Sequence, residues 1–387
     1  RIPGERQPLL KTKQMPENSK KKSAVLSKRY SLQKRILTIS GLIVALLYLL
    51  FMGLFGSNIL KNLISLVTAN EYLLIALYVF IFIIIIDVLT IPLSFYGGFI
   101  LEHMYGLSNQ KISGWIMDEL KKFLLSLPLV IIMVEIMYIF LRNFPNTWWI
   151  YVTVIWIFFS VIMAKLAPVL IFPLFYKCIP LDNKEVKESL EALAEGTGIS
   201  IQGVYSINLS KNTKKANAAL AGMGSTRRVL LGDTLLDSYS PAEIKSVFAH
   251  ELGHQVYHHI WKMLAIGTIS GSLGFAFCHL VLSNITVILG YQNIYDIAAF
   301  PAVCMSLAVS GFMLLPIQNA ISRRFERACD RYAIEKTDDP AAFISTMEKL
   351  AEQNLSDLTP NRLIELLFYS HPAISKRIEM AKKHVML

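Results

Sequence analysis

The sequence predicts a mainly α-helical protein that crosses a membrane several times and carries a smaller soluble part with a short β-sheet. The 387 residues are 54% hydrophobic and only 17% charged, and the mean hydropathy is +0.47. Water-soluble domains are less apolar and more charged than this, so lipid must cover the excess. Several apolar runs also reach the roughly 20 residues that a helix needs to cross a bilayer core of about 30 Å.

Six apolar runs have this length. We expect membrane spans at about 36–56, 72–100, 122–141, 148–175, 262–286 and 288–317. Only a short polar break separates the last two, which contain Asn284, Asn293 and Asp296. For this pair a re-entrant or partly exposed arrangement remains an open alternative.

Positive charge is concentrated at the N-terminus. Residues 1–35 hold eleven Lys and Arg against two Glu, which gives +9 of the net charge of +10. The positive-inside rule places such a segment in the cytoplasm. We expect no nucleic-acid binding, because no basic patch with interleaved aromatic residues is present. We also expect no secretory signal peptide, because the charged lead is too long and no small-residue cleavage pattern follows the first apolar run.

The spans divide the chain into three expected parts. These are a basic cytoplasmic segment at 1–35, an N-terminal membrane domain of about four spans at 36–175, and a C-terminal domain at 176–387 that includes two further spans at about 262–317. With the N-terminus inside, six crossings return residues 102–121, 176–261 and 318–387 to the cytoplasmic side. The polar, amphipathic segments would therefore share one compartment.

The polar segments indicate mixed secondary structure. Residues 183–195 have helical spacing and end at two glycines, while IQGVYSI and RRVLLGD are β-like runs on either side of a loop rich in Gly, Ala and Asn. From residue 340 onward we expect amphipathic helices. The four cysteines, at positions 178, 278, 304 and 329, form no C-x-x-C pair, so neither a disulfide framework nor a thiolate zinc site is expected.

One segment contains the candidate metal ligands and general base. It is SPAEIKSVFAHELGHQVYHH. Ser240, Pro241 and Glu243 form a capping box with proline at the first helical position, which predicts a helix start. On that helix His250 and His254 stand four residues apart on one face, as two ligands of one zinc ion require. Glu251 would be the general base that takes a proton from the attacking water and later passes it to the leaving amine. A bare H-E-x-x-H is only a hypothesis, and the alternative is two exposed histidines on an amphipathic helix.

A catalytic zinc site of this type needs a third protein ligand. Ile260 occupies the position of a metzincin-type third histidine. His258 and His259 lie too close along the same helix, and His258 fits packing or a supporting role better. The better candidate is Glu326 in ISRRFERACDRYAIEK, with Asp330 on the same helical face to accept the free N–H of a ligand histidine.

Spacing alone leaves a second interpretation of that helix open. Glu326 and Asp330 could simply form a solvated charged face. Its partners would be four arginines on the same helix, at positions 323, 324, 327 and 331.

These residues match a known family. HELGH, followed by two apolar spans and an E-x-x-x-D helix, resembles the integral-membrane metallopeptidases typified by type I CAAX prenyl endopeptidase, with the HtpX-like proteases as more distant relatives. The resemblance extends over nearly the whole chain from about residue 36. It implies a gluzincin-like zinc metallopeptidase domain, one Zn²⁺ per chain and Glu326 as the third ligand.

The resemblance also assigns roles to other positions. ANAALAGMGSTRRVLLGDTLL looks like the family's substrate-edge segment, which implies that Asn217 and Ala218 bind extended peptide. SHPAISKR looks like the late His-Pro motif, which implies that His371 stabilises the oxyanion and that Arg377 supports the site. In this sequence Cys329 stands where family members usually carry Ala.

The N-terminal half separates the subfamilies. FYGGFILEHMYGLSNQ and the stretch from Asp118 to Lys121 resemble the membrane domain of the prenyl endopeptidases, which the shorter HtpX-like chains lack. The six spans counted here compare with seven in the eukaryotic enzymes.

The sequence therefore predicts a membrane-embedded zinc endopeptidase of the CAAX-prenyl-endopeptidase type. Its expected partners are the lipid bilayer and a peptide or protein substrate, which a eukaryotic enzyme would take in C-terminally prenylated form. Alternatives are an HtpX-type quality-control protease and a non-catalytic membrane scaffold or transporter. A site-2-type intramembrane protease fits less well, because the motif helix begins with Pro241, Glu243 and Lys245 rather than inside an apolar span. The expected location is a bacterial cell membrane, or the endoplasmic reticulum in a eukaryote, with the catalytic segments on the cytoplasmic side.

Overall fold

The computed structural model describes residues 17–199, 201–222, 224–288, 291 and 293–385. Within these residues, six helical segments are long and apolar enough to cross a membrane. They are Ser23–Ser65, Glu71–Met104, Ile112–Asn143, Trp148–Phe175, His259–Thr286 and Ile297–Thr337. These six candidate spans correspond to the six predicted from the sequence, and the last two are long helices. Residues 1–16 of the basic segment lie outside the described residues, and residues 17–35 form the first part of one long helix.

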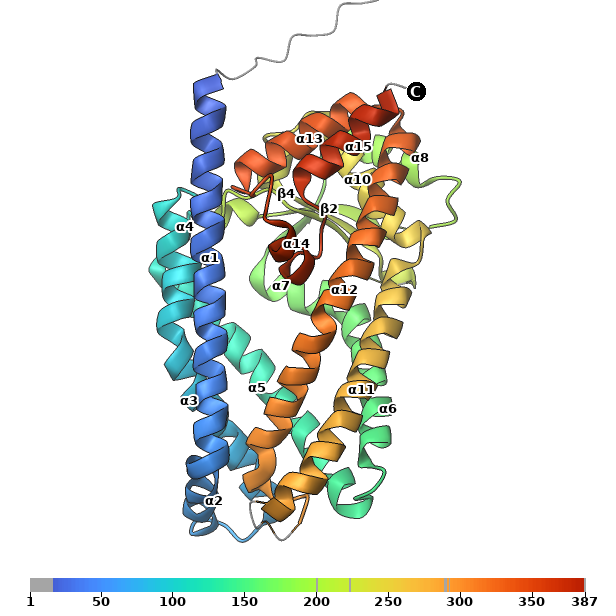
Figure 1. Ribbon diagram of the computed structural model, residues 1–387. Helices are drawn as coiled ribbons and strands as arrows, with labels where there is room; N and C mark the ends of the chain where they lie inside the picture. Colours follow the sequence, from blue (N-terminus) through green and yellow to red (C-terminus); the bar gives the residue numbers. More distant parts are fainter. Residues whose placement is uncertain (1–16, 200, 223, 289–290, 292, 386–387) are drawn as a thin grey trace, which may run out of the picture.

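The membrane part is a bundle of long helices that run between the two ends of the molecule (Figure 1). Its helices are α1 (Glu17–Phe51), α2 (Ser57–Ser65), α3 (Glu71–Phe95), α4 (Leu101–Met104), α5 (Ile112–Asn143), α6 (Trp148–Leu166), α7 (Phe172–Phe175), α11 (His259–Ile288) and α12 (Phe300–Thr337). Short π-helical turns at Met52–Gly56, Tyr96–Ile100 and Ala167–Ile171 continue the helices that precede them. One apolar core cluster, centred on residues such as Tyr78, Tyr138 and Trp148, joins α3, α5, α6, α11 and α12.

The soluble part lies at one end of the bundle. It has a four-stranded sheet in the order β1-β2-β4-β3, made of β1 (Cys178–Pro180), β2 (Gly203–Ile207), β3 (Ala218–Ala221) and β4 (Arg228–Gly232). The central pair β2 and β4 is parallel, and both edge strands are antiparallel to their neighbours. The helices of this part are α8 (Lys184–Ala194), α9 (Asp233–Leu236), α10 (Pro241–Val256), α13 (Pro340–Gln353), α14 (Arg362–Phe368) and α15 (Ile374–Val385).

The two β-like runs and the helix near 183–195 lie where the sequence predicts them. The short edge strands β1 and β3 were not visible as periodic runs, because three or four residues are too few to show alternation. A second core cluster packs the sheet against α8, α10, α13 and α15. This cluster gives the soluble part a core of its own beside the membrane bundle.

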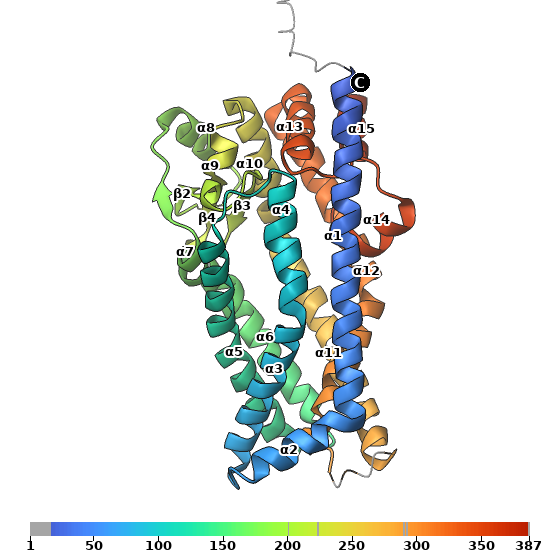
Figure 2. The same cartoon turned by 90° about the vertical axis from the view of Figure 1, so that its left-hand side faces the viewer.

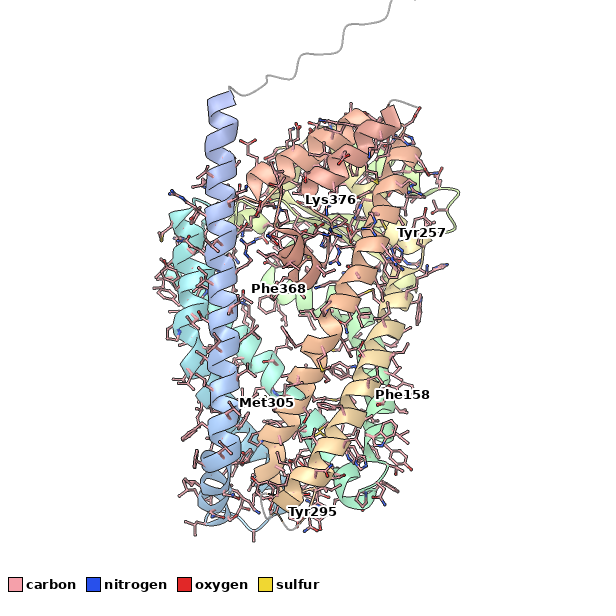
Figure 3. All side chains as sticks on the ribbon, in the orientation of Figure 1. Phe158, Tyr257, Tyr295, Met305, Phe368 and Lys376 are labelled. Atoms are coloured by element: carbon pink, nitrogen blue, oxygen red, sulfur yellow. The ribbon has the colours of Figure 1, made fainter. Side chains whose placement is uncertain are left out.

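The polar segments expected to share one side do lie at one end of the molecule. Leu107 and Ser108, which follow α4, hydrogen-bond to residues 212–214 ahead of β3, and Figure 2 shows α4 beside the sheet. Tyr257 and Lys376 are near the sheet, whereas Tyr295 is at the opposite end (Figure 3).

Helix α12 connects the two parts. Its 38 residues span about 57 Å at 1.5 Å per residue, well beyond a hydrocarbon core of about 30 Å. The helix therefore crosses the bundle and continues into the soluble part, where it carries Glu326 and Asp330.

Candidate active site

Helix α10 begins where the capping signal predicts. Glu243 N–H donates to Ser240 Oγ (3.3 Å), and Ser240 N–H donates to Glu243 Oε2 (2.7 Å), with Pro241 in the first turn. These bonds satisfy two backbone donors that a helix start leaves without intrahelical partners. The cap fixes where the helix begins. The four-residue spacing then places His250 and His254 on one face of it.

A glycine lets α12 pass close to this face. A Cβ atom at Gly253 would lie 3.2 Å from Cys329 Cα and 3.3 Å from Cys329 Sγ. Contacts of this length are tighter than most real Cβ contacts, so a side chain here would push α12 away by a few tenths of an ångström, whereas glycine permits the close approach. The approach brings Glu326 of α12 against the two histidines.

The three expected ligands converge. His250 Nε2 lies 3.2 Å from Glu326 Oε2, and His254 Nε2 lies 3.3 Å from Glu326 Oε1. The two Nε2 atoms are 3.3 Å apart. A tetrahedral zinc ion with ligand bonds of 2.0–2.1 Å has ligand–ligand edges of about 3.3–3.4 Å. The observed separations lie at or just below these edges, with each histidine facing a different oxygen of Glu326.

The electrostatics of the three converging side chains also favour a bound cation. Glu326 Oε2 is buried and accepts no well-directed hydrogen bond within the described part of the chain. Burial lowers the pKa of the His250 imidazole, but its electrostatic interactions with the nearby Asp330 and Glu326 carboxylates outweigh this and raise the pKa to about 9. Two imidazoles and a carboxylate with an unfilled acceptor form a set that suits a small divalent cation.

His250 is held from behind by a buried ion pair. Its Nδ1 lies 2.9 Å from Asp330 Oδ1, and the Asp330 side chain is completely buried. Arg377 of α15 donates to both Asp330 oxygens, with Nε 2.8 Å from Oδ2. Burial lowers the pKa of Arg377, but the Asp330 carboxylate has the larger net effect and raises it. The guanidinium therefore stays charged and neutralises Asp330, which orients the imidazole.

His254 has a different partner, which sequence reasoning missed. Its Nδ1 lies 3.2 Å from His259 Nδ1. The sequence-based interpretation favoured His258 for a supporting role, and this is wrong because His258 is exposed. His258 has a φ of 54° and separates α10 from α11. The two histidines therefore do not continue the motif helix, and the break turns His259 back toward His254.

Glu251 connects the motif helix to the edge strand β3. Leu220 N–H donates to Glu251 Oε2 (3.4 Å), and Gln255 Nε2 donates to Leu220 O (3.3 Å). Both polar backbone groups of Leu220 therefore point away from β4. Because outward-pointing residues alternate in an antiparallel edge strand, the N–H and C=O of Ala218 point the same way. Asn217 is the adjacent inward residue, since its carbonyl accepts from Gly232 N–H at 3.0 Å.

His371 reaches the cluster from a loop between α14 and α15. Its Nε2 lies 3.3 Å from Glu326 Oε1, and 59% of its side chain is exposed. Arg323 of α12 holds the start of this loop, because its Nη1 donates to Glu365 O (3.0 Å) and Tyr369 O (2.6 Å). On the alternative of a solvated charged face, Arg323 would be a partner of the carboxylates on α12. In the structure it caps the C-terminal end of α14, close in sequence to His371.

Two cavities meet at the site. One, of about 390 Å³, is bordered by Asn217, Ala218, His250, Glu251, His371 and Arg377 among others. The other, of about 590 Å³, also touches His250, Glu251 and His371 but extends along α6 and α11 to Trp156 and Met263. The site is therefore open toward the sheet edge on one side and toward membrane helices on the other.

All nine residues singled out from the sequence lie in this one region. Asn354, the residue directly after α13, is a further residue that the sequence did not single out. Its side chain accepts from Ala216 N–H (2.9 Å) and donates to Ala216 O (3.2 Å), next to Asn217. No local motif marks it, because its partner is far away in sequence.

Comparisons with known proteins identify the family to which the chain belongs. The profile of peptidase family M48 matches residues 180–385, and that of the CAAX prenyl protease N-terminal region, described as five membrane helices, matches residues 6–177. The chain is 31% identical to an uncharacterized metalloprotease, YhfN, of Bacillus subtilis, over 92% of this chain and 85% of that protein. It is 29% identical to CAAX prenyl protease 1 of Saccharomyces cerevisiae, over 74% and 67% of the two chains.

The fold agrees. The crystal structure of S. mikatae Ste24p superposes with a TM-score of 0.84 at 24% identity, and the match covers 96% of this chain and 92% of that chain. The resemblance inferred from the HELGH motif is thereby confirmed. The chain belongs to peptidase family M48, and it is a multi-span, membrane-embedded metallopeptidase.

Proposed function

We propose that this metallopeptidase is a zinc endopeptidase of the CAAX-prenyl-endopeptidase type, with one zinc ion per chain held by His250, His254 and Glu326. The observation that carries the proposal is the convergence of these three side chains at 3.2–3.3 Å between a sheet edge and a cavity along membrane helices. When bound, the zinc ion supplies Lewis-acid chemistry that lowers the pKa of a water molecule and polarises the scissile carbonyl.

The side chains would divide the work as follows. The substrate backbone would pair with the outward-facing backbone groups of Ala218, and Asn217, whose carbonyl is paired with Gly232, would contact the substrate through its side chain. Glu251, next to this strand, takes the proton of the attacking water and delivers it to the leaving amine. His371 donates to the oxygen on which negative charge develops. Asp330 and Arg377 act through His250 by fixing its ring orientation.

The second cavity supports a proposal for the substrate class. Its walls at Trp156, Met263 and Leu264 are apolar and come from α6 and α11, so a peptide with a hydrophobic attachment would be accommodated next to Glu251. The names of the S. cerevisiae relative and of the matching N-terminal region point the same way. We therefore propose a C-terminally prenylated peptide or protein as the substrate.

A quality-control protease of HtpX type is the second candidate. The relative from Bacillus subtilis favours it, because protein prenylation is not expected in bacteria. In that case the apolar cavity would accept hydrophobic segments of membrane proteins. Membership of a peptidase family argues against a non-catalytic scaffold or transporter.

We also propose the placement of the chain in the cell. The basic residues of 1–35 favour a cytoplasmic N-terminus, and the membrane domain at 36–175 and the peptidase domain at 176–387 would then present the site to the cytoplasm. A bacterial cell membrane is our first proposal, with the endoplasmic reticulum membrane as the eukaryotic equivalent.

The decisive experiment uses Glu251→Gln in purified protein. We expect hydrolysis to fall by at least about 10²–10⁴-fold, the usual contribution of a general base, while about one zinc per chain is retained by elemental analysis. Cleavage products in native membranes, compared by mass spectrometry between wild type and variant, identify the substrate. A farnesylated peptide and its unprenylated twin separate the two substrate classes. Full activity in Glu251→Gln, or a pure active protein without zinc, would contradict the proposal.

A further inference from the structure

A second group of metal-ligating atoms lies behind His254. The Nδ1 atoms of His254 and His259 are 3.2 Å apart, and Cys329 Sγ is 3.4 Å from His259 Nδ1. The three ligand atoms all lie within 4.8 Å of one another. His259 and Cys329 are buried, with 4% and 0% of their surfaces exposed.

Three features of the fold build this cluster. The break at His258 redirects His259, which on a continuous helix would point about 140° away from His254. Phe325 stacks on the His259 ring with centroids 4.1 Å apart, which fixes the ring plane. Gly253 allows α12 to come close enough for Cys329 Sγ to face His259. Cys329 lies within α12, His254 near the end of α10 and His259 at the start of α11, so the turn at His258 and the packing of α10 against α12 set the cluster.

The donor set has a clear chemical preference. One thiol and two imidazole nitrogens suit zinc and softer divalent cations rather than magnesium or calcium. A tetrahedral zinc ion would separate two nitrogen ligands by about 3.3–3.4 Å, and a nitrogen and a sulfur ligand by about 3.5–3.6 Å. The observed 3.2 Å and 3.4 Å fall slightly inside these values, so small outward movements would admit a cation.

We propose that His254, His259 and Cys329 form a second, inhibitory site for a thiophilic divalent cation such as Zn²⁺ in excess or Cd²⁺. The cation would enter through the 590 Å³ cavity, which both His254 and His259 line. Binding forms bonds to His254 Nδ1, His259 Nδ1 and Cys329 Sγ, and it releases one proton from the thiol and one from His254 Nδ1 to water.

Occupation of this site would stop peptidase activity. The inference rests on the proposed function, because both sites share His254: Nε2 faces the catalytic cluster and Nδ1 faces the second one. In the active enzyme the N–H at His254 Nδ1 donates to His259 Nδ1, an interaction that sets the tautomer and orientation of a metal ligand. A cation between the two rings replaces this hydrogen bond and adds positive charge next to the catalytic metal.

The test starts from purified protein that holds one zinc per chain, to which Cd²⁺ is added. We expect one Cd²⁺ to bind without release of the zinc, the ultraviolet charge-transfer band of a cadmium–thiolate bond to appear, and hydrolysis to fall in parallel. In Cys329→Ala the band should be absent, and the half-inhibitory Cd²⁺ concentration should rise by roughly 10–100-fold or more, the range for removing a supporting group from a metal site. Basal activity of this variant should stay near that of wild type.

Two matched controls sharpen the result. Cys278→Ala removes another buried cysteine, in the membrane core of the bundle, and His258→Ala removes the exposed neighbour of His259; both should behave like wild type. A Cys329→Ala protein that binds Cd²⁺ and is inhibited as strongly as wild type would overturn the proposal, as would stoichiometric release of zinc. The absorption band is measured equally well in Glu251→Gln, so failure of the second site and failure of the proposed peptidase mechanism are distinguishable.

Discussion

The two sides of the candidate site are built differently. On one side, Glu326 and Asp330 are 6% and 0% exposed in their side chains, and they come from a single long helix. On the other side, His371 is 59% exposed and sits on a short loop. The side that carries Glu326 and Asp330, here the ligand side, is therefore held by buried charges. The side that carries His371, here the histidine side, is held by a few hydrogen bonds from α12 to the loop.

The difference shows where rigidity is needed. A metal site requires ligands held within a few tenths of an ångström, which buried, paired groups on helices provide. A residue that acts on the substrate must be reachable by it, so His371 lies at the junction of both cavities. Breaking each side should therefore give distinct effects: loss of stability on the ligand side, and loss of turnover with an intact fold on the histidine side.

The largest expected effect comes from breaking the buried ion pair. Arg377→Gln leaves the Asp330 carboxylate buried without its cation, which typically costs about 3–5 kcal/mol. We expect a clearly lower thermal unfolding temperature in detergent, together with weaker zinc binding. Lys382→Gln, an exposed change on the same helix, is the control and should leave both properties unchanged. Equal unfolding temperatures for the two variants would show that Asp330 does not depend on Arg377.

The histidine side should respond in activity as well as in local stability. Arg323→Gln removes donors to the carbonyls of Glu365 and Tyr369. Hydrogen bonds from a charged donor contribute about 1.5–3 kcal/mol, and a misplaced His371 that loses about 1.4 kcal/mol of transition-state stabilisation lowers kcat about tenfold. Steady-state kinetics should show this fall in kcat with zinc content unchanged. The exposed neighbour Arg324→Gln should be kinetically silent; an equal loss in both variants would point to a general charge effect.

The same contrast explains what could be predicted from the sequence. The spans follow from apolar length, and the pair His250 and His254 follows from helix periodicity and one capping box, which are all local. Glu326 was recognised through the family resemblance, because nothing in its own helix distinguishes a ligand from a solvated carboxylate. The spans and the histidine pair are each encoded within one continuous segment, whereas the assignment of Glu326 needed the family resemblance.

The remaining features depend on distant contacts. His259 acquires its place only because the chain breaks at His258, and a run of two histidines after a helical motif does not reveal a positive φ. Arg323 and Asn354 act on backbone atoms that are more than 40 and more than 130 residues away in the sequence. Backbone acceptors carry no residue identity, so such pairs leave no pattern in a single sequence.

A third prediction concerns β3, the strand proposed to bind the peptide, which belongs to neither the ligand side nor the histidine side. Asn354→Ala removes both hydrogen bonds to Ala216, immediately before the strand proposed to bind the peptide. Loss of about 1 kcal/mol per hydrogen bond should raise KM roughly fivefold or more and change kcat little, because only the ordering of β3 is affected. Glu352→Ala, exposed on the same helix, is the control. An unchanged KM in Asn354→Ala would indicate that β3 is ordered by its pairing with β4 alone.

The smallest effect should be a pH dependence at the start of the motif helix. Burial raises the pKa of Glu243, but the ammonium of Lys349, the hydroxyl of Ser345 and the N–H of Ser240 outweigh it, so the pKa lies below its usual value of 4.5. A depressed pKa means that the carboxylate stabilises the folded state above the unfolded pKa, and that this contribution is lost as pH falls through the folded pKa. Wild type should therefore lose stability relative to Glu243→Gln only below about pH 4.5. Thermal unfolding at several pH values measures the difference. Parallel curves for the two proteins down to the acid limit would mean that the capping box, and not the charge, is what Glu243 contributes to α10.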